Sequence, residues 1–80
     1  MTALEKYNAI YKDIFEDELE VIPLEELEFG EAGWDSVTSM DLLALFEQEF
    51  DITIKSEDKM DFSSYKEGKQ VLNKYGIIFE

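Results

Sequence analysis

The amino-acid sequence predicts an all-α protein, a small four-helix bundle with three main helices and a short third one. Apolar residues recur at helical spacing in three segments of the 80-residue chain. Pro23, Gly30 and Gly33 all fall between residues 20 and 35, and this clustering predicts one long loop. Alternation of apolar and polar residues is confined to residues 51–55, so the sequence predicts no sheet.

The first helix is predicted over residues 3–17. Its apolar residues follow the i, i+3, i+4, i+7 spacing of a one-sided helix, and its acidic residues lie outside that face. Thr2 and Glu5 have the spacing of a capping box, which favours a helix start between them. The predicted core face consists of Leu4, Tyr7, Ile10, Tyr11, Ile14 and Phe15.

The stretch from residue 18 to residue 35 is predicted to be mostly loop, with one short helical turn. It contains too many apolar residues for a free linker. We therefore expect these side chains to tuck into the core between the helices. They are Val21, Ile22, Leu24, Leu27 and Phe29.

The second helix is predicted over residues 36–50, and it has two apolar sides. The larger side is the expected core face, with Leu42, Leu43, Phe46 and Phe50, and Leu45 at its edge. The smaller side is bordered by acids, as in a docking surface with an apolar centre and a polar rim. The alternative is that its first two apolar residues pack under the preceding loop. The apolar members of this outward strip are Val37, Met40 and Ala44, and its acids are Asp41 and Glu47.

The remaining chain is predicted to form two further helices. Ser56 offers an N-cap for a brief helix around residues 57–61. Ser64 and Glu67 form a second capping-box pattern, which opens a final helix over residues 65–75.

Two details of this C-terminal part need an interpretation. Gly68 lies within the apolar face of the final helix, where it either lets another backbone or a bound chain come close or is a tolerated weak position. We slightly favour the weak position. The tail at residues 77–79 is expected to fold back as an apolar plug.

Composition excludes most kinds of function. The chain has no Cys, so it can form neither a disulfide nor a thiolate zinc site, and it has no His, so it lacks the usual general base and the commonest metal ligand; we expect no catalytic and no metal site. The net charge of −13 disfavours nucleic acid and anionic membranes and favours basic protein partners. The N-terminus shows no targeting signal, and no apolar run approaches the length of a membrane span. The sequence thus predicts a single domain over residues 1–80 that is monomeric and cytoplasmic.

The sequence Gly-Trp-Asp-Ser-Val at positions 33–37 joins the long loop to the second helix. We expect the Ser36 hydroxyl to cap this helix and therefore to be exposed. A helix N-terminus also stabilises a phosphate group, because its free N–H groups and its dipole favour negative charge. From the Asp-Ser pair alone, ordinary capping is the more economical reading.

Residues 33–52 resemble the phosphopantetheine-attachment segment of acyl and peptidyl carrier proteins of the discrete, stand-alone type. That family has a Gly-x-Asp-Ser-Leu start followed by an apolar-acidic-apolar helix. The order of the predicted helices also resembles the family's plan over nearly the whole chain. Val37 and Phe46 stand where leucine is usual, and both keep the apolar character. The positions that match are Gly33, Asp35, Ser36, Met40, Asp41, Leu42, Glu47, Phe50 and Ile52.

The resemblance implies a carrier rather than an enzyme. It implies a 4'-phosphopantetheine arm from coenzyme A attached to Ser36, with Asp35 as the preceding acid, and an acyl or aminoacyl cargo held as a thioester. The implied partners are a phosphopantetheinyl transferase, an acyl- or aminoacyl-loading ligase, and downstream transferases or synthases with basic patches. Partner docking would fall to Val37, Met40, Asp41, Ala44 and Glu47.

Two other functions stay open on the sequence. A cofactor-free acidic helical adaptor that binds a basic partner would explain the charge and the outward strip, but it leaves the Asp35-Ser36 spacing as coincidence. A divalent-cation-binding protein would use the abundant carboxylates. The chain lacks an EF-hand loop, so we rank this function last.

Overall fold

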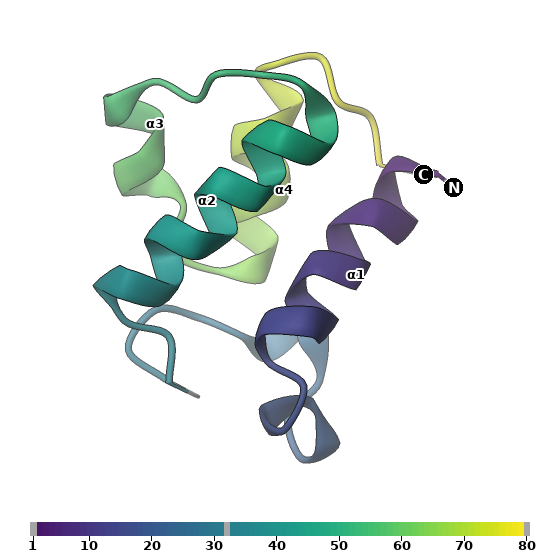
Figure 1. Cartoon of the computed structure of the whole chain (residues 1–80), viewed down its shortest axis with the longest axis vertical. Helices are drawn as coiled ribbons and strands as arrows, with labels where there is room; N and C mark the ends of the chain where they lie inside the picture. Colours follow the sequence, from purple (N-terminus) through teal and green to yellow (C-terminus); the bar gives the residue numbers. More distant parts are fainter. Residues whose placement is uncertain (1, 32, 80) are drawn as a thin grey trace.

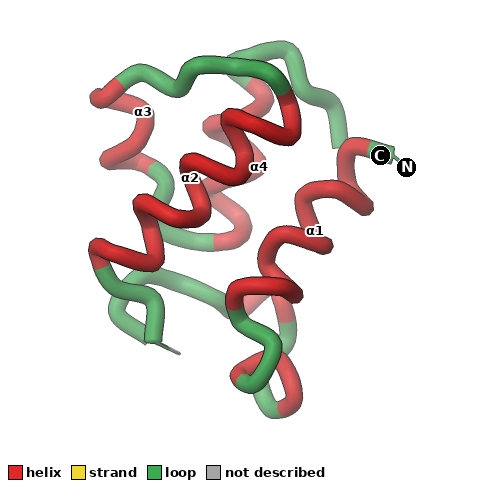
Figure 2. The backbone as a smooth tube through the Cα atoms, in the orientation of Figure 1, coloured by secondary structure: helices red, strands yellow, loops and turns green. Residues whose placement is uncertain are grey.

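The computed structural model describes residues 2–31 and 33–79. These residues form four α-helices and two short 3-10 turns, and they contain no β-strand beyond one isolated bridge between Glu28 and Ser64. The predicted all-α bundle is confirmed (Figures 1 and 2). The helices are α1 (Ala3–Ile14), α2 (Ser36–Phe50), α3 (Ser56–Asp61) and α4 (Tyr65–Asn73), and the turns are η1 (Glu18–Glu20) and η2 (Leu24–Glu26).

Helix α1 begins at the predicted capping box. The Glu5 N–H donates to Thr2 Oγ1 at 3.1 Å, and the Thr2 N–H donates to Glu5 Oε1 at 3.0 Å. The helix ends at Ile14, three residues before the predicted end. Acidic residues follow directly, and negative charge is unfavourable at a helix C-terminus, where the carbonyl groups point outward.

The long loop makes two 3-10 turns where one helical turn was predicted. Leu27 is buried, but Val21 and Phe29 are 83% and 49% exposed, so the expectation that all the loop's apolar residues enter the core is wrong for these two. Val21 ends η1 with its side chain in solvent, and Phe29 lines a surface hollow. Two backbone hydrogen bonds fasten this part of the loop to the start of α4: Phe29 N to Ser63 O at 2.7 Å, and Tyr65 N to Leu27 O at 2.9 Å.

Helix α2 has the predicted bounds, and its core face is buried as predicted through Leu42, Leu43 and Phe46. It packs against α1 and crosses in front of α4 in Figure 1. The core between these helices is largely aromatic. Tyr7 lies at its centre, with ring centroids 4.9–5.1 Å from those of Tyr11, Phe46, Tyr65 and Phe79.

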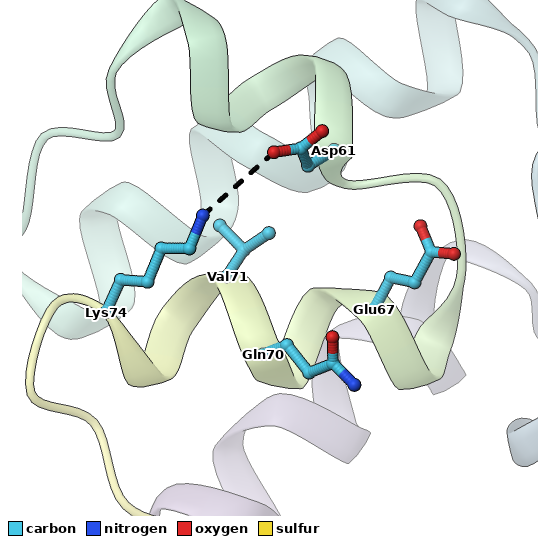
Figure 3. Close-up of a pocket in the computed structure, with 5 residues that line it drawn as sticks. All are labelled: Asp61, Glu67, Gln70, Val71 and Lys74. Carbon is cyan, nitrogen blue, oxygen red and sulfur yellow. Dashed lines mark ion pairs between the residues drawn. The ribbon is translucent and has the colours of Figure 1, made fainter.

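Helix α3 has no buried residue of its own. Asp58 anchors it to the end of α4: its carboxylate accepts hydrogen bonds from Lys74 Nζ at 3.2 Å and from the Tyr75 hydroxyl. Figure 3 shows the neighbouring groove between α3 and α4, where Lys74 Nζ lies 4.0 Å from Asp61 Oδ2. The predicted cap is wrong by one position, because Ser56 is already helical and Lys55 holds the N-cap place without a side-chain bond.

Helix α4 starts as predicted, with the Glu67 N–H donating to Ser64 Oγ at 3.0 Å, and it ends at Asn73. The Glu67 carboxylate accepts from the Ser63 hydroxyl instead of completing the capping box. The apolar tail folds back in part. Phe79 packs against Tyr7, whereas Ile78 is exposed.

Gly68 is buried inside this packing, so its interpretation as a tolerated weak position is wrong. A Cβ at this position would collide with the Tyr7 hydroxyl and would lie 2.6 Å from Cζ of Phe62. The close approach is therefore to side chains of the protein's own core. The absent side chain lets α4 reach α1.

We predict that Gly68→Ala destabilises the protein by about 1–3 kcal/mol, the usual cost of overpacking a filled core. In an exposed helix the same change would stabilise by about 1 kcal/mol. Urea unfolding measures the free energy of unfolding. Gln70→Ala, at an exposed position of the same helix, is the control and should change stability little. Equal stability of Gly68→Ala and the parent would contradict the packing described here.

We predict that Asp58→Asn lowers the melting temperature at neutral pH and that the difference from the parent vanishes in acid. The hydrogen bond from Tyr75, assisted by Lys74, holds the pKa of the Asp58 carboxyl below its usual value. Its stabilising effect is therefore complete above the unfolded-state pKa of about 3.9 and is lost as pH falls through the lower folded-state pKa.

Thermal melts at several pH values measure this difference. Changes in overall charge repulsion affect parent and variant alike, so the difference isolates Asp58. Asp61→Asn is the control, because its side chain is 66% exposed and lies farther from Lys74. A difference in melting temperature between the parent and Asp58→Asn that stays unchanged well below pH 4 would show that the charge of the carboxylate does not cause the stabilisation.

Candidate functional site

Ser36 is the first helical residue of α2, and its side chain is exposed. The expectation that its hydroxyl caps the helix is wrong. Asp35 occupies the N-cap and accepts from the Thr38 N–H at 3.0 Å through Oδ1. That bond holds the pKa of the Asp35 carboxyl below its usual value, so the carboxyl is charged at neutral pH. Within the part of the chain that the structure describes, no hydrogen bond engages the Ser36 hydroxyl, which leaves its oxygen open to reaction.

The loop before Ser36 is held by Trp34. Its ring is 1% exposed and lies against Phe15 and Tyr11 of the core, with centroid distances of 5.6 and 5.9 Å. The indole Nε1–H donates to Ser39 Oγ at 2.6 Å, which ties the loop to the first turn of α2. The backbone turns at Gly33, whose φ of +78° is accessible to glycine at little cost. Trp34 thus positions Ser36. The sequence analysis did not predict this role, and its only signal in the chain is an aromatic residue two positions before the serine.

The outward strip of α2 lies open to solvent. Val37 and Met40 are 67% and 69% exposed, so they do not pack under the preceding loop. Ala44 and Asp41 are exposed beside them. Glu47 differs from the others. It is only partly exposed, and its Oε2 accepts from the Ile54 N–H at 2.8 Å, which fixes the turn after α2. The part of these five residues in docking stays a prediction.

A hollow of about 410 Å³ adjoins Ser36, and we call it the α3 hollow. It brings together the start of α2, the end of the long loop and helix α3. Sequence reasoning did not find its loop and α3 residues, because no spacing along the chain links them to Ser36. They become neighbours only through the tertiary fold. The lining residues are Phe29, Ser36, Ser39, Lys59, Met60, Phe62 and Ser63.

Charge is distributed unevenly around this site. Residues 13–54, which include the whole long loop and α2, contain no lysine or arginine.

Among residues 2–31 and 33–79 there is no group of three or more His, Cys, Asp or Glu side chains arranged to hold a metal ion. No helix in the same ranges is both long and apolar enough to cross a membrane. The features of the site are the free hydroxyl of Ser36, the apolar outward strip beside it and an acidic surface around both.

Comparison with known proteins gives one match. A family model described as "Phosphopantetheine attachment site" matches residues 12–67, which is more than two thirds of the 80 residues. The matched range includes the long loop, α2, α3 and the first turn of α4. No curated protein and no solved structure matches the chain.

Proposed function

The chain belongs to the phosphopantetheine attachment site family, and on this premise we propose that Ser36 bears the arm and presents an acyl or aminoacyl cargo to partner enzymes. Members of this family carry a covalently attached 4'-phosphopantetheine group and are typically carriers without catalytic activity of their own. The observation that carries the assignment to Ser36 is its exposed, unengaged hydroxyl at the start of α2, inside the matched range.

The residues around Ser36 fit such a group. The hydroxyl oxygen is the right nucleophile for a phosphodiester link, and the start of α2 stabilises the negative charge of that link. The adjoining α3 hollow leaves room beside the attachment point. When bound, the group supplies a terminal thiol that holds a cargo as a thioester. The chain has no cysteine of its own, so no internal thiol competes for the cargo.

Loading requires a separate transferase. Ser36 Oγ would form a bond to the phosphorus atom nearest the pantetheine in coenzyme A, the pyrophosphate bond would break, and adenosine 3',5'-bisphosphate would leave. The hydroxyl proton has to pass to a base. The chain has no histidine, and the hydrogen bond from the Thr38 N–H lowers the pKa of the Asp35 carboxyl and so makes it a weaker base; we therefore assign the base to the transferase.

The outward strip supports a transient docking surface. Val37, Met40 and Ala44 would form the apolar centre, and Asp41 and Glu47 would meet lysine or arginine on the transferase, the loading ligase and the downstream transferases or synthases. Charge contacts at an exposed rim mainly affect the association rate and weaken with salt, which suits a carrier that must release each partner. Location in the cytoplasm and the monomeric state stay predictions.

The cofactor-free adaptor is the second candidate, since the exposed strip and the acidic surface would serve it equally well. It gives no role to the free hydroxyl of Ser36. Covalent loading separates the two functions.

We predict that incubation with coenzyme A and a broad-specificity phosphopantetheinyl transferase adds the mass of one phosphopantetheine group, located at Ser36. Ser36→Ala should gain no mass while its melting temperature stays close to that of the parent, because the side chain is exposed and makes no hydrogen bond in the described part of the chain. Ser56→Ala, at the exposed first position of α3, is the matched control and should load fully. Loading of Ser36→Ala, or a folded parent that stays unloaded beside an active control carrier, would rule out the assignment.

We predict that Met40→Glu lowers kcat/KM for loading by about tenfold or more, because burying a methionine side chain at an interface contributes about 1.5–3 kcal/mol. Thermal stability should change little, since Met40 is 69% exposed. Val21→Glu introduces a glutamate at an exposed apolar position outside the strip and should load normally. Equal loading rates for the two variants would argue against docking through Met40.

A further inference from the structure

A stack of three aromatic rings runs from the surface near Ser36 to the centre of the core. Phe62, the residue that ends α3, lines the α3 hollow together with Ser36 and is 3% exposed. Its ring centroid lies 5.2 Å from that of Phe46 on α2, which in turn lies 5.1 Å from that of Tyr7 on α1. The planes of neighbouring rings differ by 30° and 24°, so the rings face one another. We call these three residues the ring stack.

The ring stack has no free space behind it. A Cβ at Gly68 of α4 would collide with the Tyr7 hydroxyl and would lie 2.6 Å from Cζ of Phe62. Tyr7 is also held by the bond that its hydroxyl donates to the Tyr65 carbonyl at 2.5 Å. A hydrocarbon chain that entered the core from the side of Ser36 would have to displace packed rings and break a buried hydrogen bond. Both changes are unfavourable in a filled interior.

The surface around Ser36 does not enclose a long chain either. Met60 and Phe29, two apolar walls of the hollow, are 84% and 49% exposed, and Met40 of the outward strip is 69% exposed. A long acyl chain that lay on either surface would keep much of its length in water. Each hydrated methylene group is unfavourable, and a large exposed apolar patch promotes association. A short or polar cargo avoids both effects.

Building on the attachment at Ser36, we propose that the ring stack keeps the cargo outside the core and thereby suits this carrier to short or polar acyl and aminoacyl groups, not to long fatty acyl chains. Phe62 is the specificity-determining residue, because it is the member of the stack that lines the hollow. The acidic surface made by residues 13–54, which contain no lysine or arginine, would also favour the cationic ammonium group of an aminoacyl cargo.

The rate at which hydroxylamine cleaves the thioester tests whether a long chain is enclosed. The transferase loads the parent from acetyl-coenzyme A or octanoyl-coenzyme A, and intact mass confirms the product. Hydroxylamine attacks the thioester carbonyl, forms a hydroxamate and releases the thiol of the arm, which intact mass also follows. Each rate is divided by that of free acetyl- or octanoyl-pantetheine. A thioester that is hidden for two thirds of the time would react about threefold more slowly, so we expect the two ratios to agree within about threefold.

Retention on a hydrophobic interaction column gives a second, positive readout. A chain that stays outside the core is available to the column. The octanoyl form of the parent should therefore elute clearly later than the acetyl form. Neither readout depends on the activity of a partner enzyme that uses the cargo.

Phe62→Ala removes the outer ring of the stack and should open a space for the octanoyl chain. In this variant we expect octanoyl cleavage to be at least about threefold slower than in the parent, with a smaller difference in retention. Phe62→Leu is a milder variant and should show a smaller effect in the same direction. Phe15→Ala removes a buried ring beside Trp34, outside the ring stack, and should keep the rate ratios of the parent. Circular dichroism checks that each variant is folded.

The outcomes separate the two proposals. Protection of the octanoyl thioester in the parent by more than about threefold, or elution of the octanoyl form together with the acetyl form, overturns the cargo class and leaves the carrier function standing. Folded Phe62 variants that react like the parent overturn the role of Phe62. A folded parent that gains no phosphopantetheine at Ser36 overturns the carrier function and the cargo class together.

Discussion

The buried hydroxyl of Tyr7 is the interaction on which the rest of the structure depends. It donates to the backbone carbonyl of Tyr65 at 2.5 Å and lies 3.0 Å from the hydroxyl of Tyr11. Burial raises the pKa values of both phenols, so they stay neutral and retain their protons. A buried hydroxyl without a partner would cost about 1–3 kcal/mol, so this bond fixes where the first turn of α4 meets α1. The two helices meet so closely there that a Cβ at Gly68 would collide with the Tyr7 hydroxyl.

The position of Ser36 follows from this contact in a few steps. The first turn of α4 binds the long loop through Leu27 and Phe29, and the loop then buries Trp34 against α1. Trp34 in turn holds the first turn of α2 through Ser39. The exposed serine therefore follows a loop that is held by the buried rings of Trp34, Phe15 and Tyr11. The hydroxyl can be open to solvent while the backbone beneath it is fixed.

Patterns along the sequence predicted the helices well, because amphipathic spacing and capping residues are local signals. The bounds of α2 and the caps at Thr2 and Ser64 show this. The misreading of Gly68 has a tertiary cause. The need for a glycine at position 68 becomes apparent only when Tyr7 and Phe62 are brought next to it by the fold.

The candidate site likewise has one part that could be predicted from the sequence and one part that depends on the tertiary fold. Ser36 and the outward strip lie within one helix and its first turn, so their spacing could be read from the chain. Lys59 and Met60 lie more than 20 residues after Ser36 and join it only through the fold. The cap itself was misplaced, because Asp and Ser are both good N-caps and only the backbone geometry decides between them.

The burial of Trp34 has an optical consequence. It is the single indole of the chain, it is enclosed by the core, and it lies two residues before Ser36. Its fluorescence therefore comes from one place and carries no background from other tryptophans. A change in its emission wavelength or fluorescence intensity reports either an opening of the core or a disturbance at the start of α2. Comparison with far-ultraviolet circular dichroism, which follows the helices as a whole, tells these two events apart without any label.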